Sequence, residues 1–218
     1  MSGRIAATSN RPNRGGTPEA QRQRAIATRA ALVGAARTLF AEFGYHSTGT
    51  TELVARAEVT RGALYHHFSD KRDLFAEVFR TVAAELVGQS NSAVAPLSGD
   101  LWPQVTGAFR HYLHLVATNE EYQRILLIDG PTVLGWTDWR ALQSEFLASG
   151  MQEALRMLMD QGLVATQPTE ALANMLQAAL NDAALAMANT DLTAESSQVI
   201  SEAFLNLLTG LRVHQSDR

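Results

Sequence analysis

The sequence predicts an all-α protein with a three-helix N-terminal domain and a larger C-terminal helical domain. Apolar residues recur at spacings of three and four along most of the 218 residues, which is the period of a helix with one buried face. No segment shows the strict alternation of a half-buried strand. The uncharged stretch 88–99, which contains Gly, Ser, Asn and Pro, predicts a connection between two domains.

The composition is that of an ordinary globular chain, with 46% apolar and 18% charged residues. The chain has no cysteine, which excludes disulfides, thiolate metal sites and cysteine nucleophiles. No run reaches the roughly 18 apolar residues of a membrane span, and the first thirty residues contain no apolar segment of a signal peptide. We therefore expect a soluble cytoplasmic protein that does not bind a membrane.

The N-terminal residues predict an arm followed by a long helix. Residues 1–17 contain three arginines, no acid and little apolar surface, so we expect a disordered basic arm. Thr17 is a good N-cap, and Pro18 suits the first helical position, where no amide hydrogen is needed. The apolar stripe that follows ends at Gly44, a candidate left-handed C-cap.

Three more helices are expected before the connection. Hydroxyl side chains among residues 48–51 offer a cap for a helix of about two turns. Thr60 can cap a second short helix over residues 61–67. Ser69-Asp70 can cap a longer helix that leads towards the second domain.

Beyond residue 100 the sequence shows only helical patterns, which Gly and Pro residues separate. The expected helices span 101–118, 120–128, 137–161, 169–189 and 193–211. The expected breaks are Gly130-Pro131, Gly162 with Pro168, and Thr190-Asp191, and Gly135 is a further interruption in the first of these segments. The chain therefore divides into an arm over 1–17, a first domain over 18–70 and a second domain over 71–218.

Charge is distributed unevenly along the chain. Residues 1–72 contain eleven basic and five acidic residues, a net charge of +6, whereas the remainder carries −10, which gives the total of −4. A cationic N-terminal part on an anionic body indicates that this part meets a polyanion such as DNA. Alternatively, the basic residues only form solvated helix faces.

Two short helices joined by a tight turn predict a helix-turn-helix, which lays its second helix in the DNA major groove. Such a unit needs an apolar back, a front that forms hydrogen bonds and flanks that neutralise phosphates. The predicted back consists of Leu53, Ala57, Val59 and Leu64. The predicted front consists of Arg61, Tyr65, His66 and His67, and the predicted flanks are Thr50, Thr51 and Lys71.

This segment closely resembles the N-terminal domain of the TetR family of transcriptional regulators. The residues that carry the resemblance are Gly44-Tyr45, Thr48, Glu52-Leu53, Val59 to Phe68, Lys71 and Leu74. The resemblance covers about residues 20–80. It departs from the family pattern at Thr50, Val54 and Glu58, where the family usually has a hydrophobic residue, an alanine and a glycine. By position, the resemblance implies DNA contact by Thr50, Thr51, Arg61, Gly62, Ala63, Tyr65, His66, His67 and Lys71.

Each of these residues also has a simpler interpretation. Arg61 suits bidentate contact with guanine. Alternatively, it is simply a solvated residue in the first turn of a helix. Tyr65 reaches a phosphate or packs against its own domain. His66 and His67 point about 100° apart and have no partner at ligand spacing, so we expect no metal site and no cofactor. The arm enters a minor groove or stays disordered, and we expect disorder.

The last two helices predict a dimer. Between residues 171 and 190 only Asp182 is ionised, and a helix that is apolar nearly all round needs partners on several sides. With the final helix it predicts a two-fold four-helix interface, which the resemblance also implies; an ordinary intrachain core is the alternative. A homodimer would mirror a near-palindromic double-stranded DNA operator.

The middle helices combine aromatic and polar side chains that suit a pocket for a small-molecule effector. The candidate lining residues are Trp102, Phe109, His111, Tyr112, Trp136, Trp139, Asn174, Gln177 and Asn181. Each aromatic residue taken alone is better explained as core. We therefore predict a repressor that a small molecule releases from DNA, with an effector-independent dimer controlled by its own concentration as the alternative.

An enzyme is the third hypothesis. His111, His114, Asp129 and Asp182 are candidates for acid–base chemistry. No nucleophile with a base, glycine-rich phosphate loop or metal set accompanies them in the sequence. We therefore expect no enzymatic activity.

Overall fold

The computed structural model describes residues 17–92, 100–188 and 194–213, and helices account for most of them. In chain order the elements are α1 (Pro18–Phe43), α2 (Thr50–Arg56), α3 (Arg61–His67), α4 (Lys71–Ser92), α5 (Leu101–Thr118), α6 (Glu120–Tyr122), the π-helical η1 (Gln123–Asp129), α7 (Gly130–Gln143), the π-helical η2 (Ser144–Ala148), α8 (Ser149–Asp160), α9 (Thr169–Ala188) and α10 (Ala194–Thr209). These ranges contain no strand, only an isolated bridge between Val164 and Arg212. The predicted all-α fold is confirmed.

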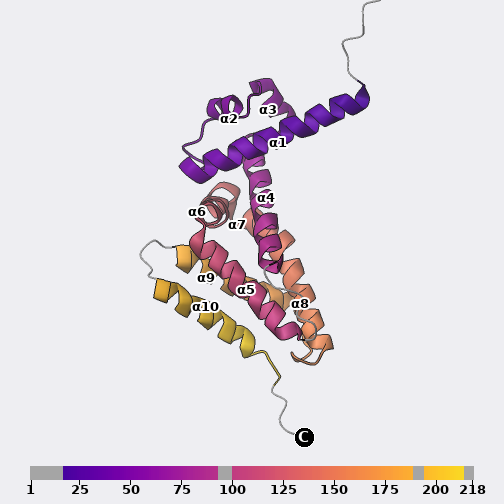
Figure 1. The fold of residues 1–218 in the computed structure, drawn as a ribbon, viewed down its shortest axis with the longest axis vertical. Coiled ribbons are helices and arrows are strands. Elements are labelled where there is room, and N and C mark those ends of the chain that lie inside the picture. The colour runs from indigo at the N-terminus through magenta and orange to yellow at the C-terminus, as the bar shows by residue number, and fades with distance from the viewer. Residues whose placement is uncertain (1–16, 93–99, 189–193, 214–218) are drawn as a thin grey trace, which may run out of the picture.

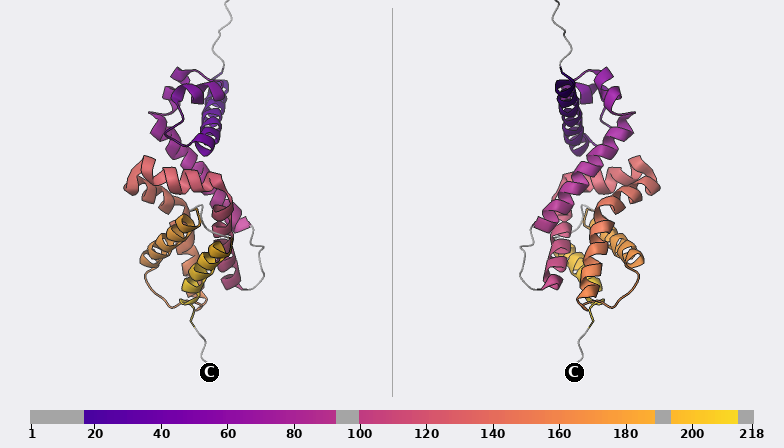
Figure 2. Two further views of the ribbon diagram at one scale, coloured as in Figure 1. Left: turned by 90° about the vertical axis from the view of Figure 1, so that its left-hand side faces the viewer. Right: turned by 90° about the vertical axis from the view of Figure 1, so that its right-hand side faces the viewer.

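The helices form two lobes that α4 joins (Figure 1). Helices α1 to α3 and the first turns of α4 form the smaller lobe at one end of the molecule. Helix α4 then runs into the larger lobe, where it packs beside α5 and the α7 region. Figure 2 shows the segment from α6 to α7 lying directly against the smaller lobe, where it meets the C-terminal half of α1.

The buried apolar side chains form one continuous cluster that extends through both lobes. In the smaller lobe, Phe40 of α1, Leu53 of α2 and Leu64 of α3 are fully buried. Helix α4 adds Phe75 and Phe79 to the same cluster, which continues into α5, α9 and α10. Because the lobes share this core, a shift of α4 is transmitted to both of them.

Most of the predicted helix caps are present. The Oγ1 atom of Thr17 accepts a hydrogen bond from the amide of Ala20 at 3.3 Å, and Thr60 caps α3 by accepting from the amide of Ala63 at 3.1 Å. Asp70 caps α4 by accepting from the amide of Asp73 at 2.7 Å. The predicted hydroxyl cap of α2 is wrong, because Gly49 occupies that position without a side-chain bond.

The predicted break at Gly130-Pro131 is also wrong. Helical structure continues past Gly130, and Pro131 lies in the first turn of α7, where no amide hydrogen is needed. The chain changes direction at Gly135, the other interruption expected in this segment, which has φ of 75° and ψ of 160°. Gly44 also has a positive φ, 80°, but its ψ of 164° lies outside the left-handed helical region.

Several predictions fall wholly or partly outside the described ranges. These are the arm apart from Thr17, most of the connection over 88–99, and the break at Thr190-Asp191. The first part of that connection, residues 88–92, belongs to α4. No helix in the described ranges is both long and apolar enough to span a membrane.

Candidate DNA-binding surface and effector cavity

Helices α2 and α3 form the predicted helix-turn-helix. Leu53 and Leu64 are fully buried against the core, whereas Ala57 and Val59 are half-buried at the turn. Glu58 lies in this turn with φ of 55° and is the only residue other than glycine with a positive φ in the described ranges. The left-handed conformation explains why a glycine suits this position and why glutamate carries a conformational cost there.

The outer face of α3 is free for contact with a partner. Arg61, Tyr65 and His66 are exposed, and the Tyr65 side chain has 47% of its surface accessible. The Arg61 guanidinium lies 5.8 Å from the centre of the Tyr65 ring, so the two side chains project together. Gly62 is exposed and Ala63 half-buried, which allows the helix to approach another surface closely.

Two histidines end α3. The rings of His66 and His67 lie edge to face, with centroids 5.2 Å apart. Burial lowers the pKa of His67, and the positive charges of His66 and Arg29 lower it further. These effects favour the neutral imidazole of His67. No group of three potential metal ligands occurs in the described ranges.

The predicted flanks occupy different environments. Thr51 is exposed and Thr50 half-buried at the start of α2. Lys71, the only lysine of the chain, instead holds the loop between α1 and α2. Its Nζ donates to the carbonyl oxygens of Tyr45 at 2.8 Å and Thr48 at 2.9 Å, and it lies 4.0 Å from the centre of the Tyr45 ring. Two of its three donors are therefore already used, and burial lowers its pKa.

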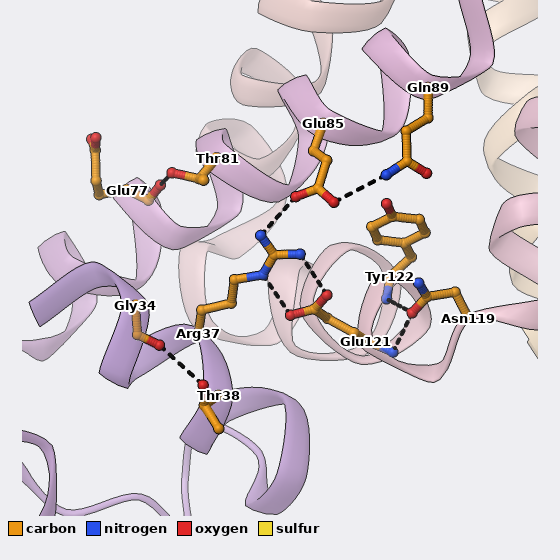
Figure 3. Close-up of polar contacts among 10 residues, drawn as sticks. All are labelled: Gly34, Arg37, Thr38, Glu77, Thr81, Glu85, Gln89, Asn119, Glu121 and Tyr122. Carbon is orange, nitrogen blue, oxygen red and sulfur yellow. Dashed lines mark hydrogen bonds and ion pairs between the residues drawn. The ribbon is translucent and has the colours of Figure 1, made fainter. Parts of the chain in front are cut away.

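An ion-pair cluster joins the smaller lobe to α6 (Figure 3). Arg37 of α1 donates from Nε and Nη2 to both oxygens of Glu121, each at 2.7 Å, and from Nη1 to Glu85 of α4 at 2.6 Å. These hydrogen bonds raise the pKa of Arg37 above its ordinary value. The sequence gives no sign of this cluster beyond the polar position of Arg37, because its partners lie 48 and 84 residues away.

Two further contacts cross the same junction. The amide of Tyr45 donates to the buried carboxylate of Asp129 at 2.8 Å. Arg72, in the first turn of α4, donates to the carbonyl oxygens of Val133 at 3.2 Å and Leu134 at 2.7 Å. The end of α1 and the start of α4 are therefore both attached to the segment from η1 to α7.

The larger lobe contains a cavity of about 380 Å³ between the end of α4, α5 and α8. Its lining is mostly apolar and includes Phe109, Tyr112, Phe146 and Met151. Phe109 and Tyr112 are thus the two predicted pocket residues that line this space. Burial raises the pKa of Tyr112 well above its ordinary value, so its hydroxyl stays neutral.

The other predicted pocket residues are dispersed. Trp102 lines a void of only about 10 Å³ in the core, and Trp139 is buried with its Nε1 donating to the carbonyl of Leu126 at 2.8 Å. Trp136 is 68% exposed, and its ring packs against that of Trp139 at an angle of 47°, with centroids 5.1 Å apart. His111 is half-buried and Asn174 exposed.

Gln177 and Asn181 are buried on the inner side of α9. Neither lines the 380 Å³ cavity directly. Asn181 donates to Gln143 of α7 at 2.6 Å. Gln143 is a buried polar residue that the sequence analysis missed, because nothing in its local pattern distinguishes it from an exposed glutamine.

The outer sides of α9 and α10 keep large apolar side chains exposed. Met175 and Leu185 lie on α9, and Val199 and Leu207 lie on α10, with between 36% and 68% of their surfaces accessible. The two helices pack side by side. Exposed apolar side chains on adjacent helices are typical of a surface that another chain covers.

A helix-turn-helix with an exposed polar face, attached to a helical lobe that contains a cavity, defines the class of DNA-binding transcriptional regulators. Residues 32–78 match the family model described as "Bacterial regulatory proteins, tetR family". Residues 102–211 match the model described as "Tetracyclin repressor-like, C-terminal domain". The chain belongs to the TetR family.

Individual relatives agree with this assignment. A TetR-family transcriptional regulator from Pectobacterium atrosepticum is 33% identical, with a TM-score of 0.71 over 88% of this chain and 98% of that one. The transposon Tn10 TetC protein of Escherichia coli is 24% identical over 72% of this chain and 78% of its own length. The structure of RolR with resorcinol has a TM-score of 0.68 at 20% identity, over 85% of this chain and 89% of that one.

Proposed function

We propose that this chain is a homodimeric repressor that binds a near-palindromic operator through α3 and is released by a small molecule bound in the larger lobe. The observation that carries the proposal is the physical connection between the two sites. The cavity is lined by α4 and α5, and α4 begins in the helix-turn-helix lobe, where Arg72 contacts the carbonyls of α7. A change in α4 at the cavity therefore alters the position of the recognition helix.

DNA contact is assigned to the exposed side chains of Arg61, Tyr65 and His66 and to the half-buried His67, with Gly62 and Ala63 allowing close approach. The hydroxyls of Thr50 and Thr51 and the remaining donor of Lys71 are placed at the flanks to reach phosphates. A dimer formed through α9 and α10 would set two copies of α3 about one DNA turn apart. RolR, a relative in fold, was crystallised with resorcinol, which supports a small-molecule effector for this chain as well.

A ligand shifts such an equilibrium only through its different affinity for the two states. The test is to select duplexes from a random pool with the purified protein and then titrate a library of small molecules into the complex. We expect enrichment of a near-palindromic sequence and at least one compound that lowers its affinity tenfold or more. Enrichment without any release by compounds that bind the protein would favour an effector-independent regulator, and no enrichment at all would contradict DNA recognition.

A further inference from the structure

A second, much smaller void lies next to the cavity. This void has a volume of about 10 Å³, close to the space that one water molecule or one hydroxyl group needs. Val87, Tyr112 and Phe146 line both spaces, so the two are neighbours separated only by these side chains. Gln143 lines the void and not the larger cavity. The void is therefore the inner end of the site, and the apolar cavity is its body.

Buried polar side chains lie at and beside this inner end. Gln143 and Tyr112, which are 3% and 4% exposed, line the void, and Gln143 Oε1 accepts a hydrogen bond from Asn181 at 2.6 Å. The Oδ1 of Asn181 and the Nε2 of Gln177, one turn apart on α9, are fully buried and unpartnered among the described residues. Neither of these two residues lines the void, but Gln143 connects Asn181 to it.

An unpartnered buried polar group is costly, and two of them on neighbouring turns of α9 are explained if a bound molecule orders the polar side chains beside them. The polar side chains that line the void, the Gln143 amide and the Tyr112 phenol, can each donate and accept a hydrogen bond. A hydroxyl group matches this set because it donates and accepts at once. A carbonyl or ether oxygen only accepts.

The charge of the site is as informative as its hydrogen bonds. Among the described residues, Glu153 is the only charged one that lines the cavity, and none of those that line the void is charged. Glu153 is largely exposed on α8 and pairs with Arg156 at 3.3 Å. The described lining therefore offers no cation to compensate a bound carboxylate or phosphate, and burying an unpaired charge is very costly.

We propose that this site binds an uncharged molecule with an apolar body and a hydroxyl head group. The body occupies the cavity between α5 and α8, and the hydroxyl enters the void beside Tyr112 and Gln143. This inference rests on the proposed effector role of the cavity. It also connects the head group to the regulated element, because Gln143 ends α7 and the part of α7 before the kink at Gly135 carries the carbonyls that hold Arg72.

Three probes with one body and different heads test the proposal: 4-propylphenol, 4-propylanisole and 4-propylbenzoate. Binding to the full chain is measured at pH 7.5 by isothermal titration and by the shift in thermal midpoint. We expect 4-propylphenol to bind at least tenfold more tightly than the anisole, and the benzoate not to bind. Equal affinity for the anisole, tighter binding of the benzoate, or no binding of the phenol up to millimolar concentration would overturn the proposal.

Variants then locate the head group. Gln143→Leu should reduce the preference for phenol over anisole to less than threefold, and Tyr112→Phe, which removes a single oxygen, should reduce it as well and serves if Gln143→Leu unfolds. Gln152→Leu is the matched control, because Gln152 lies next to Met151 on α8 but lines neither space. An unchanged preference in both folded variants would contradict this location.

Operator affinity measured in the same samples separates the two proposals. If the phenol binds with the expected preference but leaves operator affinity unchanged, the head-group inference holds and the effector role fails. If the benzoate or the anisole binds equally well and releases the operator, the effector role holds and the head-group inference fails.

Discussion

Arg37 and Glu121 form a two-fold hydrogen-bonded ion pair between α1 and α6, with both N–H···O distances at 2.7 Å. The two residues are 84 positions apart, and both side chains are about three-quarters buried. The paired geometry fixes the direction as well as the distance between the groups. The pair therefore sets the orientation of the helix-turn-helix lobe relative to the lobe that contains the cavity.

The Arg37–Glu121 pair should contribute measurably to the free energy of unfolding. A double-mutant cycle of Arg37→Ala and Glu121→Ala, measured by urea denaturation, should give a coupling energy of about 1 kcal/mol, because the pair is partly shielded from water. The pair of Glu153 and Arg156 on α8, which is exposed and i,i+3 spaced, is the control and should give less than about 0.5 kcal/mol. Equal coupling energies in the two cycles would contradict the prediction that the Arg37–Glu121 pair stabilises the protein more than an exposed ion pair does.

Replacing Glu58 by glycine should stabilise the protein. Glu58 has φ of 55°, and the left-handed conformation costs a residue with a Cβ about 1 kcal/mol relative to glycine. Glu58→Gly should therefore raise the free energy of unfolding by roughly 0.5–1 kcal/mol. Glu42→Gly, in the last turn of α1, is the matched control and should lower it by about the same amount; a loss of stability in both variants would show that the turn is unstrained.

Lys71→Met should destabilise the smaller lobe even without DNA. The substitution keeps the length of the side chain but leaves the carbonyls of Tyr45 and Thr48 without their donor, at a cost of about 1–3 kcal/mol. Thermal unfolding followed by circular dichroism should show a lowered midpoint. Arg24→Met, at an exposed arginine of α1, is the control and should change the midpoint less; a larger change in the control would contradict the role of Lys71 in holding the loop.

Arg61→Ala should weaken binding to a duplex selected by the wild-type protein by about 1–3 kcal/mol, and Tyr65→Phe by a smaller amount. Both tips are exposed, so neither substitution should change the free energy of unfolding by more than about 0.5 kcal/mol. Fluorescence anisotropy at fixed salt measures the affinity. Arg156→Ala, on the far lobe, should leave it unchanged, and wild-type affinity in Arg61→Ala would mean that α3 is not the recognition helix.

Operator affinity should rise as the pH falls from 8 to 6. Burial and the charges of His66 and Arg29 lower the pKa of His67 in the free protein, whereas nearby phosphates favour the charged imidazole and raise its pKa in the complex. Binding therefore takes up protons, and the affinity should increase roughly three- to tenfold over this range. The variant His66→Gln/His67→Gln should show a flatter profile; an identical slope would place both rings away from the DNA.

The sequence was sufficient for the features that depend on neighbouring residues. The helical period, the caps at Thr17, Thr60 and Asp70, and the buried Leu53 and Leu64 with their exposed neighbours on α3 all follow from local spacing and side-chain chemistry. The same reasoning misplaced the break near Pro131. A proline in a first helical turn is compatible with either a start or an interruption, and only the preceding π-helical turn of η1 decides between them.

The predicted pocket residues show that local sequence spacing does not determine which side chains line the cavity. Phe109 and Tyr112 line the cavity, but Trp136 and Trp139, three residues apart, lie on the surface and in the core respectively. Whether each of these side chains is buried depends on how α7 is rotated against its neighbours. The spacing of apolar residues defines this rotation only coarsely.

The sequence by itself determined that the chain is helical, that its basic N-terminal part is a helix-turn-helix, and which tips of α3 face outward. The tertiary structure decided that Arg37 meets Glu121, that Lys71 holds a loop, and that Gln143 and Tyr112 meet at one void. The physical reason is that helix formation and capping involve residues within a few positions of each other, whereas these contacts join residues 23 to 84 positions apart and exist only once the helices have packed.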